Sequence, residues 1–195
     1  MEVLDIALAY YQRGGPVMAP LVTVSLFMWI MICERFVYYM GLEKGDLGEL
    51  IRVVRGEAKA PAASGMAGAI ARYMAENRTG NRELDRRLVD QCGMRIRPGI
   101  SRNLAVICIL AAVSPLLGLL GTVTGMITTF DVIAMFGTGN ARALAGGISE
   151  ALITTQSGLM VSIPGMLMSV LLVRKAKRLE DRLDETLMTL KRHIR

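Results

Sequence analysis

Apolar residues gather in three long blocks along the chain, and nearly all charged residues lie between these blocks. Residues 14–33 and 104–130 carry no charge, and residues 143–173 carry only Glu150. A helix needs about 20 apolar residues to cross a bilayer. The pattern predicts an all-α membrane protein with three transmembrane helices. The predicted spans are residues 14–40, 104–136 and 143–173.

The segments outside these spans also follow helical spacing. Residues 1–13 predict a short amphipathic helix that ends at the helix-breaking Gly14-Gly15-Pro16. Residues 41–103 predict helices, the last of which starts near Asn81 and runs into the second span with a kink at Pro98-Gly99.

A short loop, 137–142, joins the second and third spans. In the tail, 174–195, leucines at helical spacing form an apolar seam that continues the third span. We expect this seam to pack on the helix that leads into the second span. No segment shows the alternation of a strand, so helices account for the whole chain.

The distribution of basic residues predicts the orientation in the membrane. Thirteen of the 23 Lys and Arg residues lie in 34–103 and eight follow residue 173, whereas Arg13 and Arg142 are the remaining two. Basic residues favour the cytoplasmic side. The segment 41–103 and the C-terminal tail are therefore predicted to be cytoplasmic helical extensions, with the N-terminus and the loop 137–142 on the outer side of the membrane.

Composition argues against several classes of function. The basic segment 34–103 also holds nine acids and no aromatic platform, which disfavours nucleic-acid binding. The three cysteines and the single His193 offer no metal constellation and no closed disulfide set. No nucleotide loop or nucleophile–base pair is present, so we expect neither an enzyme nor a cofactor. The first block lacks a basic n-region and a cleavage site, so it predicts a retained span.

Small residues recur at steps of three and four in the second and third spans. Such a stripe lets two membrane helices approach closely, and we predict helix packing through it. The predicted packing residues are Ser114, Gly118, Gly121, Gly125 and Thr128 in the second span, and Ala151, Thr155, Gly158, Ser162, Gly165 and Ser169 in the third. Pro115 and Pro164 lie inside these spans and predict helix kinks.

Three polar groups in these spans are candidates for a proton path. A charge within a span costs at least ~2.5 kcal/mol, so an intramembrane acid such as Glu150 indicates function. Thr122 and Thr155 lie at related depths, and we expect all three to line one water-accessible pocket. A buried threonine also often bonds to its own helix carbonyl, so a purely structural role stays open for each hydroxyl.

Two motifs in the same spans resemble the MotA/TolQ/ExbB proton channel family, most closely its ExbB branch. They are Ser-Pro-Leu-Leu-Gly-Leu-Leu-Gly-Thr-Val-Thr-Gly-Met at 114–126 and Gly-Ile-Ser-Glu-Ala-Leu-Ile-Thr-Thr at 147–155. Ser114 and Gln156 depart from the residues usual in relatives. The resemblance implies a subunit of the bacterial inner membrane that forms a homo-oligomeric ring, with a pentamer expected.

The same resemblance implies partners and residue roles. The ring would surround the helices of an ExbD- or TolR-like single-span protein that carries a membrane aspartate. Proton flow would then power outer-membrane transport through a TonB-like protein. Thr122, Glu150 and Thr155 correspond to family positions on the proton path.

Alternatives from other classes stay open on the sequence alone. A TolQ-like role in envelope maintenance fits the same motifs. A structural scaffold without an ion path also fits the small-residue stripes, whereas a small-solute transporter lacks support because no internal repeat is present. The cargo, the subunit number and the choice between protons and sodium are not encoded in these motifs.

Overall fold

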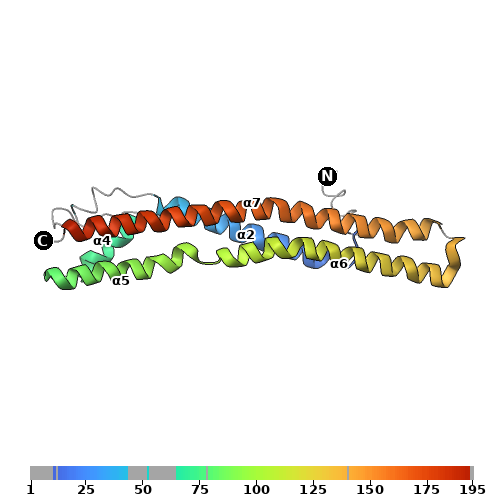
Figure 1. Ribbon diagram of the computed structural model, residues 1–195, viewed down its shortest axis with the longest axis horizontal. Coiled ribbons are helices and arrows are strands. Elements are labelled where there is room, and N and C mark those ends of the chain that lie inside the picture. The colour runs from blue at the N-terminus through green and yellow to red at the C-terminus, as the bar shows by residue number, and fades with distance from the viewer. Residues whose placement is uncertain are drawn as a thin grey trace. The chain divides into compact units, whose positions relative to one another are not determined.

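A computed structural model describes residues 11, 13–43, 52, 65–77, 79–139 and 141–193. In these residues the helices are α2 (Met18–Leu42), α4 (Met66–Asn77), α5 (Arg82–Ser101), α6 (Leu104–Phe136), the 3-10 turn η1 (Gly137–Gly139) and α7 (Ala141–His193) (Figure 1). No strand occurs in this described part. The amphipathic helix predicted for 1–13 and the part of the predicted helices between residues 44 and 64 fall almost wholly outside it.

Within the described residues, three helical stretches are long and apolar enough to cross a membrane, as the hydropathy pattern predicted. They lie in α2, in α6 and in the first part of α7, and α6 occupies the range predicted for the second span. Packing divides the chain into two compact units. Unit 1 comprises Met1–Ile32 and Ala105–Ser169, and unit 2 comprises Cys33–Leu104 and Val170–Arg195.

In unit 1, the backbones of α6 and α7 touch each other at two glycines. A Cβ atom built on Gly158 would lie 2.9 Å from the Cα atom of Gly118, and one on Gly118 would lie 3.2 Å from the Cα atom of Thr155. No side chain fits between backbones this close. Glycine therefore permits the contact that small-residue spacing predicts for membrane helices.

The same contact continues in both directions as an antiparallel seam. Gly121 faces Thr154, Gly125 faces Ala151, and Gly147 faces Thr129. Residue numbers rise on α6 as they fall on α7, which makes the pair antiparallel. The buried positions of α6 follow one another at steps of three and four: Ile107, Ala111, Ser114, Gly118, Gly121, Gly125 and Thr129.

Two threonines differ from the predicted stripes. Thr129 is buried in the seam while Thr128 is exposed, and Thr154 is buried while Thr155 is only half-buried. Each pair is adjacent in the sequence, and the small-residue spacing fits either member. The choice depends on the opposing helix, because the Thr129 and Thr154 side chains occupy the space that Gly147 and Gly121 leave open.

Helix α2 covers the α6–α7 pair in unit 1. The Met28 side chain is fully buried, and its Sδ atom would lie 2.7 Å from a Cβ atom on Gly165. The same Cβ atom would lie 3.3 Å from the Ala111 methyl group. Met28 thus fills the gap that two small residues leave, one on each helix of the pair.

The junction between α5 and α6 differs from the predicted continuous helix. Helical structure runs through Pro98 and stops at Arg102-Asn103, where Asn103 adopts a left-handed backbone with φ 63°. Asparagine tolerates this conformation better than most residues, because its short polar side chain bonds locally. The sequence predicted a kink at Pro98-Gly99, whereas the break between the helices lies at Arg102-Asn103.

Side chains from α2 cap the end of α5 within unit 2. Arg35 Nη1 donates to the Gly99 carbonyl at 3.0 Å, and the Tyr39 hydroxyl donates to the Ile100 carbonyl at 2.8 Å. These carbonyls lose their helical donors where α5 stops. A cation at a helix C-terminus is also favourable to the helix dipole. The buried Arg35 therefore stabilises the end of α5.

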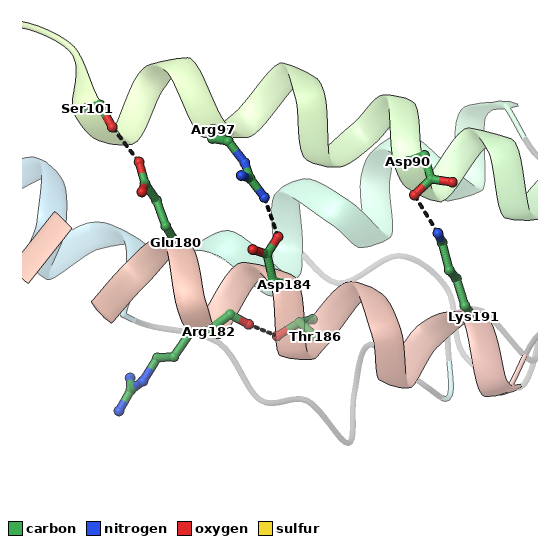
Figure 2. A network of polar contacts seen from close by, with 8 residues as sticks. All are labelled: Asp90, Arg97, Ser101, Glu180, Arg182, Asp184, Thr186 and Lys191. Carbon is green, nitrogen blue, oxygen red and sulfur yellow. Dashed lines mark hydrogen bonds and ion pairs between the residues drawn. The ribbon is translucent and has the colours of Figure 1, made fainter. Parts of the chain in front are cut away.

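The tail of α7 packs on α5 in unit 2, as the leucine seam predicted. Leu179, Leu183 and Leu190 are almost fully buried. Three polar pairs flank the apolar contact: Ser101 with Glu180, Arg97 with Asp184, and Asp90 with Lys191 (Figure 2). Exposed ion pairs contribute only about 0–1 kcal/mol each, so the pairs select the register and the leucines supply most of the stability.

A cysteine lies within the apolar core of unit 2. Cys92 on α5 is buried, and this burial raises the pKa of its thiol to about 11 although nearby Arg95 opposes the shift. The thiol is therefore protonated at neutral pH and a poor nucleophile. It acts as a small apolar core residue.

The glycine contact makes a direct prediction about stability. Gly158→Ala should destabilise the protein by about 1–3 kcal/mol, because its methyl group would meet the backbone of α6, which cannot rotate aside. The control is Gly146→Ala in the same helix, where nothing lies within 4 Å of the new methyl group. Thermal unfolding in detergent measures both. Equal stability of the two variants would contradict the close backbone contact.

Candidate functional site

Glu150 lies against the turn that precedes α2. Its side chain is half-buried, and its Oε1 atom occupies the place that a Cβ atom on Gly15 would take. Gly15 has a left-handed backbone with φ 66°. The acid on α7 is thus next to the backbone of a residue far away in the sequence.

The two candidate threonines both donate hydrogen bonds to helix carbonyls. Thr155 Oγ1 donates to the Gly118 carbonyl on the opposing helix and to the Ala151 carbonyl on its own helix, each at 3.2 Å. Thr122 Oγ1 donates to the Leu119 carbonyl at 2.6 Å. Both side chains are half-buried. Each hydroxyl oxygen keeps lone pairs with which it can accept a hydrogen bond from water.

Thr122 and Thr155 lie on the same side of the α6–α7 seam. Thr122 follows the buried seam residue Gly121 by one position, and Thr155 follows the buried Thr154 in the same way. One position corresponds to a rotation of about 100° around the helix axis. Two antiparallel helices turn in opposite senses when viewed from one end, so these two positions face the same side. The bond from Thr155 to Gly118, one turn before Thr122, agrees with this placement.

Glu150 lies on the other side of the seam. It precedes the seam residue Ala151 by one position, so it points about 100° in the opposite direction. Its contact with Gly15 marks this as the side of the turn before α2. Within one chain, the structure brings the two threonines to one side and does not bring Glu150 to them. The single water-accessible pocket expected for all three residues therefore stays a prediction.

The sequence pattern did not identify two residues of this region as candidates for the functional site. Thr154 is fully buried, and its Oγ1 atom donates to the Glu150 carbonyl at 2.9 Å and to the Ala151 carbonyl at 3.0 Å. Gly15 was read only as a helix breaker. No signal in the sequence links Gly15 to Glu150, although the doubled glycine before a proline does mark an unusual turn.

The proline in α6 has a partner on α7. Pro115 lacks an N–H group, so the Ala111 carbonyl loses its usual donor within the helix. The Ser162 hydroxyl replaces it, donating to this carbonyl at 2.8 Å from a buried position. Helix α6 therefore continues through Pro115. Helix α7 likewise continues through Pro164.

In the described residues, no group of three or more His, Cys, Asp or Glu side chains is arranged to hold a metal ion. In residues 105–130 and 144–169 of unit 1, the polar groups are hydroxyls, backbone carbonyls, the Gln156 amide and the Glu150 carboxylate. Such groups suit the transfer of protons or the hydrogen bonding of water and of a partner helix.

Comparison with known proteins places this arrangement in a family. Residues 57–185 match the model of the MotA/TolQ/ExbB proton channel family. The chain belongs to this family. The matched range contains α6 with its motif at 114–126, and α7 as far as residue 185 with its motif at 147–155. Because the chain belongs to this family and its described part has three apolar helices, we infer that it is a multi-pass membrane protein of a proton-channel family.

Several curated relatives carry the name ExbB. A putative biopolymer transport protein ExbB-like 1 of Synechocystis is 52% identical over 65 residues, which is 32% of this chain and 26% of that protein. The biopolymer transport protein exbB1 of Vibrio cholerae is 37% identical over 92 residues, 47% of this chain and 40% of that protein. These matches thus span less than half of either relative.

A longer match is more distant. A putative biopolymer transport protein ExbB-like 1 of Helicobacter pylori is 24% identical over 181 residues, 89% of this chain and 90% of that protein. Similarity at this level extends along most of the chain.

The pairing of Pro115 with Ser162 predicts an energetic coupling. Ser162→Ala should cost about 1–3 kcal/mol, because the Ala111 carbonyl then stays buried without a donor. In a Pro115→Ala background the cost should fall by at least ~1 kcal/mol, because residue 115 regains an N–H group for that carbonyl. A double-mutant cycle on thermal or denaturant unfolding measures the coupling.

Ser157→Ala is the control for this cycle, since the Ser157 hydroxyl donates to the Ile153 carbonyl of its own helix. Its cost should be the same in both backgrounds. An equal cost of Ser162→Ala with and without Pro115 would show that the serine does not replace the missing donor.

Proposed function

We propose that this chain is the proton-channel subunit of an inner-membrane, ExbB–ExbD-like motor. Copies form a ring around the helices of an ExbD- or TolR-like single-span protein, and the proton motive force powers outer-membrane transport through a TonB-like protein. Membership of a proton-channel family and the ExbB names of its relatives support this function.

The observation that carries the proposal is the pair of hydroxyls on one side of the α6–α7 seam. Thr122 and Thr155 are half-buried on a side that otherwise presents apolar residues such as Leu119 and Leu159. An apolar surface with two hydroxyls suits a partner helix that carries one acid. We assign this side to the central pore, where the partner's aspartate moves protons.

Glu150 has a different role in this proposal. It lies on the side of the Gly15 turn, across the seam from the two threonines, so we place it at the subunit contacts that flank the outer part of the pore. Its carboxylate sets the hydrogen bonding and polarity there, and the partner's aspartate is the group that binds and releases each proton. The positive-inside pattern supports a periplasmic N-terminus, and thus a periplasmic position for this end of α7.

A structural scaffold without an ion path is the second candidate. The observation that favours it is that both threonine hydroxyls already donate to helix carbonyls. In that case the polar groups only fix the helix register. Measurements of proton flux distinguish the two functions, because a scaffold has no flux to lose.

Glu150→Ala should abolish proton uptake by liposomes that contain this chain and its co-expressed single-span partner, and should leave the oligomer seen by size exclusion intact. The expected cause is loss of the only acid in the apolar stretch 143–173. The control is Asp131→Ala, which removes an exposed acid at the far end of α6. Full uptake with Glu150→Ala would remove the acid from the mechanism.

Thr155→Val should lower proton uptake by about tenfold, equivalent to roughly 1.4 kcal/mol on a barrier, because it removes a hydroxyl from the pore side. Thr155→Ser keeps the hydroxyl and should retain most of the uptake. Thr128→Val is the matched control, since Thr128 is exposed and donates to its own helix at 3.1 Å. Equal uptake by all three variants would favour the scaffold.

A further inference from the structure

The contact between Gly15 and Glu150 depends on the lack of a side chain at residue 15. A Cβ atom there would lie on the Oε1 atom of Glu150, 2.6 Å from its Cδ atom and 3.2 Å from its Cγ atom. The carboxylate thus occupies the space of the missing side chain. Any other residue at position 15 would have to displace it.

Backbone conformation alone does not account for this glycine. Gly137 has nearly the same left-handed backbone, φ 68° against 66° for Gly15, and nothing lies within 4 Å of its Cβ position. Gly14 also has a neighbour at its Cβ position, but that neighbour is Met18 of the same segment. Of these three glycines, Gly15 alone leaves room for a side chain from α7.

The backbone of Glu150 is fixed by its neighbours. The Glu150 carbonyl accepts the buried Thr154 hydroxyl at 2.9 Å, and the adjacent Ala151 packs against Gly125 of α6. Only the side-chain torsions of Glu150 remain to be set. The turn at Gly15 is the described contact in which its carboxylate end takes part.

We propose that Gly15 is a positioning residue for Glu150: the turn before the first span sets where the carboxylate of the third span lies. The inference rests on the proposed function and deepens it. The first span then does more than anchor the protein, because its first turn determines the position of the acid in the proton pathway.

The first test compares two glycine variants with equal backbone strain. Gly15→Ala and Gly137→Ala each place a methyl group on a left-handed backbone, but only the first displaces Glu150. In liposomes containing the chain and its co-expressed single-span partner, Gly15→Ala should lower proton uptake roughly tenfold or more. Gly137→Ala should leave it near the native level. Equal uptake by the two variants would overturn the positioning role.

A rescue separates positioning from mere loss of stability. Glu150→Asp shortens the side chain by one methylene group, which withdraws the carboxylate from the new methyl group at residue 15. Gly15→Ala combined with Glu150→Asp should therefore recover uptake relative to Gly15→Ala alone. If the loss of uptake in the double variant instead equals the product of the two single losses, the residues do not act on each other.

Cross-linking tests the contact without any flux. With the three native cysteines replaced by alanine, Gly15→Cys and Glu150→Cys are combined, since the Cβ atom of residue 15 and the Cγ position of residue 150 lie 3.2 Å apart. Copper phenanthroline should oxidise the two thiols to a disulfide within one chain, which mass spectrometry identifies. Gly137→Cys with Glu150→Cys is the control pair. No faster bond formation than in the control would overturn the proposed contact.

The outcomes distinguish this inference from the proposed function. If Glu150→Ala abolishes uptake while Gly15→Ala matches Gly137→Ala, the acid is functional and the positioning role fails. If the cross-link forms but Glu150→Ala keeps full uptake, the contact is real and the proposed function of the acid fails. If Glu150→Asp alone is inactive, the rate of disulfide formation decides whether residue 15 contacts residue 150.

Discussion

The packing of unit 1 depends on the direct contact between the backbones of α6 and α7. Lipid is as apolar as a leucine side chain, so membrane helices gain little from the hydrophobic effect when they associate. Close packing must replace it, and Gly118 and Gly158 bring the two backbones together. The other seam positions, the bond from Ser162 to Ala111 and the direction of each threonine all follow from this approach.

The sequence predicts much of this arrangement, because small residues at steps of three and four indicate the seam directly. It cannot select between adjacent threonines, since Thr154 and Thr155 differ by about 100° and only the opposing helix decides which is buried. The hydrogen-bond donor for the Ala111 carbonyl could not be predicted either. Pro115 indicates that a carbonyl is freed, but not which side chain donates to it. The contact between Glu150 and Gly15 was not predicted, because it joins two segments that are distant in the sequence.

Unit 2 illustrates how a polar group is accommodated where a helix ends. Arg35 would be costly to bury alone, but its two terminal nitrogens donate to the Gly99 carbonyl and to Glu34. These bonds offset part of the cost of burying the cation and supply a donor at the end of α5. The break at Asn103 and the burial of Arg35 therefore depend on each other, and the sequence alone predicts neither.

The bond from Ser162 to Ala111 differs in kind from the helical bond that it replaces. An amide N–H is fixed by the plane of its peptide, whereas a serine hydroxyl swings about a single bond. This hydrogen bond can therefore open and close by rotation of one side chain, with no turn of either helix unwound. The helix pair thus has an adjustable polar link at the level of Pro115, where a backbone bond would be rigid.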